Sequence, residues 1–220
     1  KILNPFFVRN EIKDFIEDWR FVKPQEKAFL LPSQLVSIAD KKMKDKKATS
    51  VTFGAKDEAA IVGYFVEKKE EGEKGGRGEK GEHKKEDSRG QEDIWVLKLD
   101  AKGVEEWQKT IGGASQELVS SVKQTPDGGF IIAATSSSDK SAEKEKDSFG
   151  GLDYWIIKID SKGKIEWQHT YGGLYNDIVK KVVCSPDGGY LVGGYSNSPE
   201  SGTKTEKNYG IGDYWLLKLD

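Results

Sequence analysis

The sequence contains very little cysteine and no long apolar run. Cys184 is the one cysteine among 220 residues, so a disulfide within the chain is excluded. It lies in an apolar strand pattern, and we interpret it as a small buried side chain rather than a reactive thiol. No run of about 18 apolar residues occurs, so the sequence predicts no transmembrane segment.

The chain also has little net charge. Its 35 Lys and Arg residues stand against 37 Asp and Glu residues, which gives a formal net charge of −2. A balance of this kind provides no basic surface for nucleic acid or for an anionic membrane. We therefore predict no nucleic-acid partner.

Residues that commonly carry catalysis are equally scarce. The two histidines are His83, in a charged stretch, and His169, at a repeat position where the preceding copy has Lys109. No Cys and His cluster indicates zinc, and no Gly-x-Ser-x-Gly elbow is present. The run Gly75-Gly76-Arg77-Gly78 lacks the Gly-Lys-Ser/Thr ending of a phosphate loop. The sequence therefore predicts no catalytic residue and no enzyme activity.

What the sequence does contain is a repeat of sixty residues. The segment Asp-Ile-Trp-Val-Leu-Lys-Leu-Asp at 93–100 returns in similar form at 153–160 and at 213–220. Between 93–135 and 153–195, 18 of 43 positions are identical without a gap. Self-similarity at a fixed period of this length is typical of repeat architectures.

Each repeat predicts four short strands. In one period they are expected at 117–125, 130–135, 153–160 and 164–171. The third strand is apolar on successive residues, which indicates that both of its faces are covered. A four-stranded sheet buried on both faces and stacked on its own copies is a β-propeller blade. We therefore predict an all-β fold of propeller blades, with a flat β-solenoid as the alternative.

The repeat also predicts the domain organisation. Residues 1–46 do not fit it, and apolar residues at helical spacing after Asn10 predict a short helix there. Blades are expected over 47–220, and a closed propeller needs about four to eight of them. We interpret the sequence as a partial propeller or a fragment of one. Its expected parts are a degenerate blade at 47–111 with a long charged loop at 67–92, a blade at 117–171, and a blade at 177–220 that lacks its last strand.

Trp107 and Trp167 carry a resemblance to a known family. Each ends the pattern Asp, two residues, Gly, three residues, Trp, and Gly-Gly follows. This pattern resembles the tryptophan-docking motif of quinoprotein-type propellers, and the longer unit is similar to repeats of secreted and surface propellers of bacteria and some archaea. The resemblance covers about 48–220. It implies an extracytoplasmic location and indoles sandwiched between neighbouring blades, so we expect Trp167→Ala to loosen the stacking.

Five carboxylates form the candidate site. Three of them open the expected third strands and two follow the Gly-Gly links, at the end that carries the long loops 67–92, 136–152 and 196–212. They are Asp93, Asp153, Asp213, Glu117 and Asp177. Acidic side chains and loop carbonyls are the oxygen ligands that Ca²⁺ needs, so these residues are candidate calcium ligands. The alternative is that each carboxylate caps its strand by accepting hydrogen bonds from local backbone N–H groups. No other cofactor is predicted.

Long loops at one end of a repeat fold favour binding there. Our leading hypothesis is a non-catalytic secreted or cell-surface propeller module that binds a protein partner or serves as a scaffold in a larger assembly. The first alternative is a carbohydrate-binding propeller, in which exposed Tyr171, Tyr175 or Tyr209 would stack on sugar rings. The second alternative is a quinoprotein-like enzyme, which absorbance from a bound cofactor would reveal.

Overall fold

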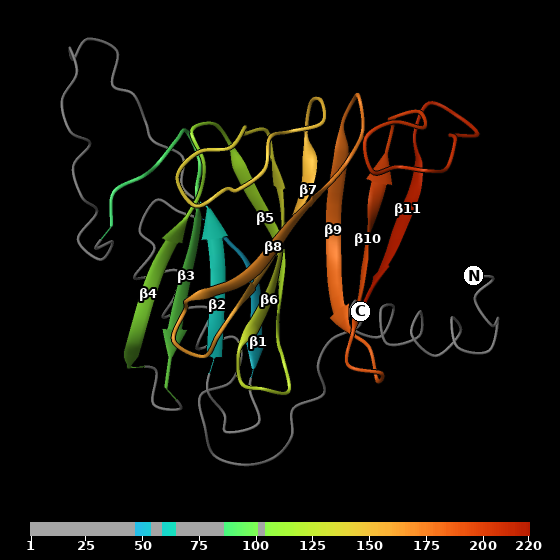
Figure 1. Ribbon diagram of the computed structural model, residues 1–220. Coiled ribbons are helices and arrows are strands. Elements are labelled where there is room, and N and C mark those ends of the chain that lie inside the picture. Colours follow the sequence, from blue (N-terminus) through green and yellow to red (C-terminus); the bar gives the residue numbers. More distant parts are fainter. Residues whose placement is uncertain (1–46, 54–58, 65–85, 101–103) are drawn as a thin grey trace, which may run out of the picture.

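The computed structural model describes residues 47–53, 59–64, 86–100 and 104–220. These residues form three antiparallel sheets and no helix (Figure 1). The all-β fold class is therefore confirmed for the described part. The helix expected within 1–46, and most of the charged loop 67–92, lie outside the described residues.

The first sheet contains four strands in chain order. They are β1 (Lys47–Phe53), β2 (Ala59–Tyr64), β3 (Ile94–Leu99) and β4 (Glu105–Ile111). The strands β1 and β2 pair antiparallel in the segment where the sequence analysis expects a degenerate blade, and the turn between them lacks the Pro-Asp-Gly-Gly sequence.

The second sheet has the same order and the third sheet repeats three of its strands. The second sheet consists of β5 (Glu117–Gln124), β6 (Phe130–Ser136), β7 (Asp153–Ile159) and β8 (Ile165–Tyr171). The third sheet consists of β9 (Asp177–Cys184), β10 (Tyr190–Ser196) and β11 (Asp213–Leu219). The strand bounds of the second sheet differ from the predicted ones by at most one residue, because strong turn signals flank every strand.

The hairpin turn between β5 and β6 shows how local sequence sets this geometry. Gly128 has a φ of +82°, a conformation that glycine adopts without steric cost. The carboxylate of Asp127 accepts the N–H of Gly129 at 2.8 Å, which closes the turn. The hydroxyl of Thr125 and the amine of Lys158 hold the pKa of Asp127 down to about 2.

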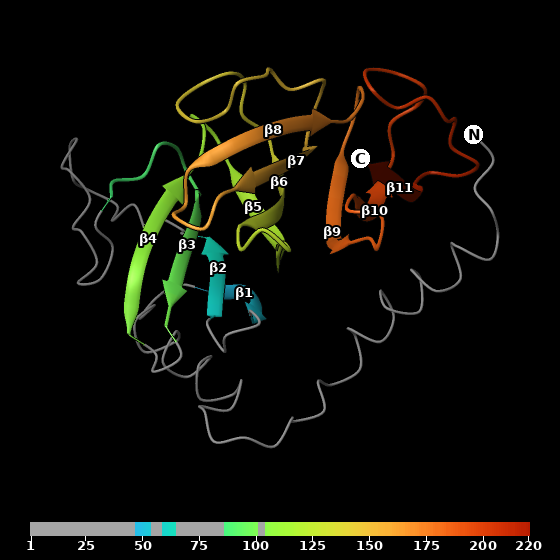
Figure 2. The same ribbon diagram turned by 60° about the horizontal axis from the view of Figure 1, so that its bottom comes forward.

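The sheets pack face to face in chain order, with their first strands side by side. Strand β1 contacts β5, and β5 contacts β9. Every residue of β7 is buried, which confirms that the third strand is covered on both faces. Trp95, Trp155 and Trp215 are core residues, with exposed fractions of 1, 0 and 7%. The three described sheets form an open stack and not a closed ring (Figure 2).

One tryptophan joins the first two sheets as the docking interpretation predicts. The indole N–H of Trp107, on β4, donates to the carbonyl of Ser161 in the turn after β7, at 3.0 Å. Its ring lies against Gly163 and 6.2 Å from the ring of Phe130, both in the second sheet. Trp167 occupies the same place in the second sheet and lies 5.8 Å from Tyr190 of the third. Both tryptophans therefore lie between neighbouring sheets.

Candidate functional site

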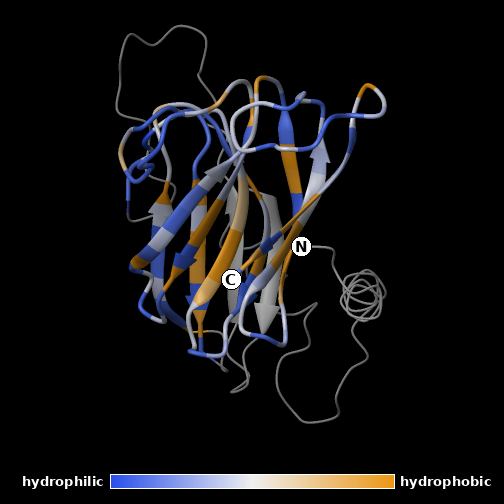
Figure 3. Cartoon of the chain, turned by 45° about the vertical axis from the view of Figure 1, so that its right-hand side comes forward, coloured by the Kyte–Doolittle hydropathy of each residue, from blue (hydrophilic) through white to orange (hydrophobic). Residues whose placement is uncertain are grey.

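The long loops and the links between sheets lie at one end of the stack (Figure 1). We call this end the loop rim and define it by residues 112–116, 136–152, 172–176 and 196–212. Figure 3 shows that it is mainly hydrophilic, whereas apolar residues concentrate along the strands. The opposite end carries only tight turns within the described chain. The loop rim therefore carries the long polar loops, which are the segments that favour binding in a fold of this kind.

The three aspartates that open the third strands share one contact. Each carboxylate accepts the backbone N–H of the residue four positions earlier. The pairs are Asp93 with Arg89, Asp153 with Phe149 and Asp213 with Tyr209, all at 2.7 Å. A carboxylate used in this way fixes the end of the preceding loop to the start of its strand.

Glu117 and Asp177 follow the same rule on the first strands. Their carboxylates accept the N–H of Gly113 at 2.8 Å and of Gly173 at 2.7 Å, again four positions earlier. Serine hydroxyls from the long loops donate to the same two carboxylates. They are Ser136 and Ser138 to Glu117, at 2.8 and 2.6 Å, and Ser198 to Asp177, at 2.9 Å. Each carboxylate therefore ties a long loop to the link that precedes its own strand.

Four of the five carboxylates are completely buried, and Asp213 is the more exposed one. Burial raises the pKa of Glu117, although hydrogen bonds from Ser138 and Gly113 oppose the shift. Burial also raises the pKa of Asp153, and the neighbouring charge of Asp177 adds to the rise. One oxygen of Asp153 and one of Asp177 accept no hydrogen bond.

The structure supports the capping role more directly than a calcium role. Within the described residues, no group of three or more His, Cys, Asp or Glu side chains is arranged to hold a metal ion. Ca²⁺ takes six to eight oxygen ligands, whereas these carboxylates already accept hydrogen bonds from the backbone. Calcium binding at Asp93, Asp153, Asp213, Glu117 and Asp177 stays a prediction.

Two buried lysines organise the long loops, and the sequence analysis missed them. The amine of Lys144 donates to the carbonyl of Lys146 at 2.7 Å and contacts the hydroxyl of Thr170 at 3.3 Å. The amine of Lys204 donates to the carbonyl of Glu206 and to the side chain of Asn208. Burial lowers the pKa of Lys144. Lys144 and Lys204 are 1 and 5% exposed. Each therefore stabilises its loop from the inside and does not lie in solvent.

The signal for these lysines is present in the repeat. Ser136, Ser138, Ser141 and Lys144 return sixty residues later as Ser196, Ser198, Ser201 and Lys204. The hydroxyl of Ser141 accepts the N–H of Ala114 at 2.8 Å, and that of Ser201 accepts the N–H of Leu174 at 2.9 Å. A position-by-position comparison of the loops would have found the pattern, which the general polarity of the loops conceals.

Between the second and third sheets, the loop rim exposes apolar side chains. Phe149, Leu174 and Tyr175 are 42, 54 and 54% exposed, and we call them the rim cluster. Their backbone segments lie side by side, because the N–H of Gly151 donates to the carbonyl of Tyr175 at 3.1 Å and the backbone at Gly150 lies against the carbonyl of Leu174. An ordered loop that exposes large apolar side chains provides a surface for association.

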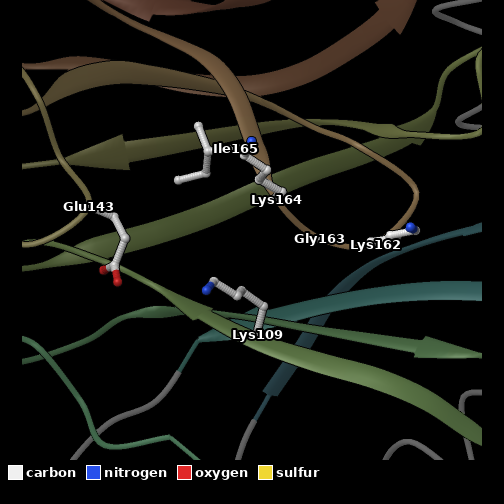
Figure 4. Close-up of a pocket in the computed structure, with 6 residues that line it drawn as sticks. All are labelled: Lys109, Glu143, Lys162, Gly163, Lys164 and Ile165. Carbon is white, nitrogen blue, oxygen red and sulfur yellow. The ribbon is translucent and has the colours of Figure 1, made fainter.

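A depression of about 350 Å³ lies between the outer strands of the first two sheets (Figure 4). It is lined by Lys109, Glu143, Lys162, Gly163, Lys164 and Ile165. The carboxylate of Glu143 pairs with Arg89 at 2.9 Å. The three lysines suit an anion, and the lining contains no nucleophile paired with a base.

The remaining candidates for reactivity have structural surroundings. The ring of His169 lies 5.5 Å from Trp167 and 5.9 Å from Tyr171. Cys184 is half-buried, and burial raises the pKa of its thiol, which disfavours the reactive thiolate. This agrees with the interpretation of Cys184 as a packing residue.

Comparisons with known proteins assign no family to the chain. No family model and no curated protein matches it. It is similar to the crystal structure of a protein of unknown function from Bacteroides caccae, with 13% sequence identity and a TM-score of 0.39. The match covers 68% of this chain and 39% of that one, so this chain spans less than half the length of that protein. None of the described segments forms a helix with the length and apolar character that a membrane span requires.

Proposed function

We propose that the chain is a non-catalytic β-propeller module, secreted or on the cell surface, whose loop rim binds a protein partner or anchors a larger assembly. The stacked four-stranded sheets, their sixty-residue period and the docked tryptophans support the propeller part of this proposal. The location rests on the resemblance of the repeats to secreted and surface propellers.

The rim cluster carries the binding part of the proposal. Phe149, Leu174 and Tyr175 stand on loops that buried Lys144, Lys204 and the serine hydroxyls hold in place. A preorganised surface loses little conformational entropy on binding, and aromatic side chains commonly provide most of the binding energy at interfaces. Polar loops around an apolar centre have the composition of a protein interface.

Affinity capture from the native source, quantified by mass spectrometry, tests the proposal. Leu174→Asp places a charge in the rim cluster, and Val104→Asp is the matched control, because Val104 is 59% exposed in a turn at the opposite end. We expect the same partner with the wild type and Val104→Asp, and at least about tenfold less with Leu174→Asp. Equal capture by both variants would contradict binding through the rim.

Carbohydrate binding is the second candidate because two of the three tyrosines named for it are exposed. Tyr175 is 54% and Tyr209 is 92% exposed, whereas Tyr171 is half-buried and burial raises its pKa. Titration with soluble polysaccharides should show binding that Tyr175→Ala weakens and Val104→Ala, at the opposite end of the stack, leaves unchanged. Binding that neither rim variant, Tyr175→Ala or Tyr209→Ala, alters would exclude stacking on these rings.

A further inference from the structure

Asp153 and Asp177 form a buried pair of carboxyl groups at the junction of the second and third sheets. Both residues are 0% exposed. Their backbones run side by side, because the N–H of Asp177 donates to the carbonyl of Leu152 at 2.5 Å. The link between the sheets contacts both groups, since Gly172 lies against the carboxylate of Asp153 and the N–H of Gly173 donates to that of Asp177. Two acidic side chains therefore share one buried site.

Each carboxyl group of the pair uses only one of its two oxygens. The Oδ2 atom of Asp153 accepts the hydroxyl of Ser148 at 2.6 Å and the N–H of Phe149 at 2.7 Å. The Oδ2 atom of Asp177 accepts the hydroxyl of Ser198 at 2.9 Å in addition to the N–H from the link. The Oδ1 atoms of both aspartates are buried without a hydrogen-bond partner. An unsatisfied buried oxygen is unfavourable, and it is more so when the group carries a charge.

The equivalent junction between the first two sheets satisfies its carboxylate differently. Glu117 stands there in the place of Asp177, sixty residues earlier. Its longer side chain reaches three donors: Oε1 accepts the hydroxyls of Ser136 and Ser138, and Oε2 accepts the N–H of Gly113. The shorter Asp177 leaves one oxygen without a donor. The pair at the second junction therefore needs a donor that the surrounding backbone and hydroxyl groups do not supply.

The charged and titratable neighbours of the pair direct their own donors elsewhere. Burial and the charge of Asp177 raise the pKa of Asp153, and the charge of Lys144, from the loop before β7, opposes the rise. The amine of Lys144 donates to a loop carbonyl and a threonine hydroxyl, and its charge also faces Glu117. The hydroxyl of Tyr154, which Asp177 influences electrostatically, donates to a backbone carbonyl of the third sheet. One shared cation therefore leaves the pair with excess negative charge unless the pair binds a proton.

The same two carboxyl groups hold the backbone of the rim cluster. Asp153 accepts the N–H of Phe149, and Asp177 accepts the N–H of the residue before Leu174. The serine hydroxyl that donates to Asp177 also accepts the N–H of Tyr175, at 2.9 Å. A change in the charge of the pair therefore acts directly on all three members of the rim cluster.

We propose that Asp153 and Asp177 hold one proton between their two unpartnered oxygens, and that loss of this proton loosens the rim cluster as the pH rises. With the proton in place, one carboxyl group donates to the other and the pair carries a single negative charge. Without it, two buried carboxylates repel each other, and neither has a donor for its second oxygen. The stabilising effect is therefore present at low pH and is lost as the pH rises through the pKa of the folded pair. As a control over binding this switch rests on the proposed function, whereas the proton and its effect on the rim do not.

Carboxyl-carbon NMR of the labelled protein measures the proton directly, with EDTA present so that no divalent cation competes for the site. The signal of Asp153 is assigned as the one that vanishes in Asp153→Asn. We expect Asp153 to titrate above the ordinary aspartate pKa of about 3.9, and to titrate lower in Asp177→Asn, where the asparagine removes a charge and donates an N–H. Asp213→Asn, at the same repeat position but more exposed, is the control and should leave this titration unchanged. An ordinary titration of Asp153, or one that Asp177→Asn does not alter, would overturn the inference.

Hydrogen exchange at the amides of Phe149 and Gly173 tests the connection to the rim. Their protection factors, which correct for the intrinsic pH dependence of exchange, should fall at least about tenfold across the pH range in which Asp153 loses its proton. Asp153→Asn replaces the protonated carboxyl by an amide that donates at every pH, so its protection should stay constant. If that variant does not fold, Asp177→Asn provides the same comparison. Constant protection in the wild type across an observed titration would overturn the switch.

Affinity capture at two pH values, one below and one above the titration of Asp153, separates this inference from the proposed function. We expect the wild type to capture less partner at the higher pH, and Asp153→Asn to capture the same amount at both. Equal capture by the wild type at both pH values would overturn the control over binding. Absence of any partner at either pH would contradict the proposed function, while the titration and the exchange would still decide whether the pair holds a proton.

Discussion

At the scale of single residues, the buried aspartates occupy the space that a side chain on the first glycine of each Gly-Gly link would need. A Cβ atom on Gly172 would lie 1.7 Å from a carboxylate oxygen of Asp153, and one on Gly112 would lie 1.9 Å from Asp93. Non-bonded carbon and oxygen atoms do not approach so closely, so only glycine leaves room for the aspartate. The two residues of each pair are 19 positions apart, which explains why both recur together in the repeat.

Gly172→Ala should therefore destabilise the protein by about 1–3 kcal/mol, the usual cost of forcing extra volume into a packed site. Gly210→Ala is the control, because nothing lies within 4 Å of a Cβ placed there. Urea unfolding of both variants measures the difference. If the two variants are equally stable, the aspartate does not need the space at Gly172.

The carboxyl of Glu117 should make stability depend on pH. Burial raises its pKa in the folded protein above the unfolded value of about 4.3. Its contribution to stability is therefore fully present below the unfolded pKa and is lost as the pH rises through the folded pKa. Glu117→Gln removes this dependence.

Urea unfolding of the wild type and Glu117→Gln between about pH 4 and pH 8 measures the effect. The free energy of unfolding of the wild type, relative to the variant, should fall as the pH rises across that window. The exposed Glu145, replaced by Gln, is the control for the loss of one carboxyl group. A flat difference for Glu117→Gln would contradict the raised pKa.

At the scale of elements, each outer strand is attached to the next sheet by one tryptophan. Trp107 on β4 contacts the turn after β7 through its ring and its N–H group. Gly163 in that turn has a φ of +83°, and its missing side chain lets the indole approach the backbone. The tryptophan of one sheet and the glycine of the next therefore meet between two successive sheets, whereas Asp160 accepts the N–H groups of Lys162 and Lys164 within its own turn.

Trp107→Ala should cost about 2–3 kcal/mol, below the ~3–5 kcal/mol of a fully buried tryptophan, because the indole is half-buried. Trp107→Phe keeps the ring against Gly163 but loses the hydrogen bond to Ser161, so its cost should be smaller. The midpoint of thermal unfolding ranks the three proteins. An unchanged midpoint in Trp107→Ala would refute the docking role.

The strands could be predicted from sequence because their signals are local. The Pro-Asp-Gly-Gly turn fixes the ends of β5 and β6, and the apolar run at 154–157 indicates a strand covered on both faces. The ordered arrangement of the long loops could not be predicted from their amino-acid composition. Lys144 is charged like its neighbours in the loop, and only the folded structure supplies the carbonyl and hydroxyl groups that accept hydrogen bonds from its buried amine.

At the scale of the whole molecule, stability should be highest in the middle of the stack. The second sheet is covered on both faces, and all residues of β7 are buried. The third sheet has a covered face toward the second sheet and exposes Tyr195, Tyr214 and Leu216. The stability of the third sheet therefore depends on the second sheet more than the stability of the second sheet depends on the third.

Hydrogen exchange should reveal this gradient in the natural chain. We expect the amides of β7 to exchange at least about tenfold more slowly than those of β11, since the free energy of local opening varies widely across a structure. Amides of β10, paired on both sides, should be intermediate. Equal protection of β7 and β11 would mean that the stack unfolds as one unit.

The sequence by itself determined the repeat, its strands, its turns and the identity of the core tryptophans. These features follow from residue spacing and from backbone preferences that act over a few residues. Only the tertiary structure decided the roles of the charged groups and whether equivalent apolar residues are buried or exposed. Tyr154 and Tyr214 occupy the same position of the repeat, yet one is 0% and the other 94% exposed. The difference arises because burial depends on whether a neighbouring sheet is present, and the local sequence does not encode that.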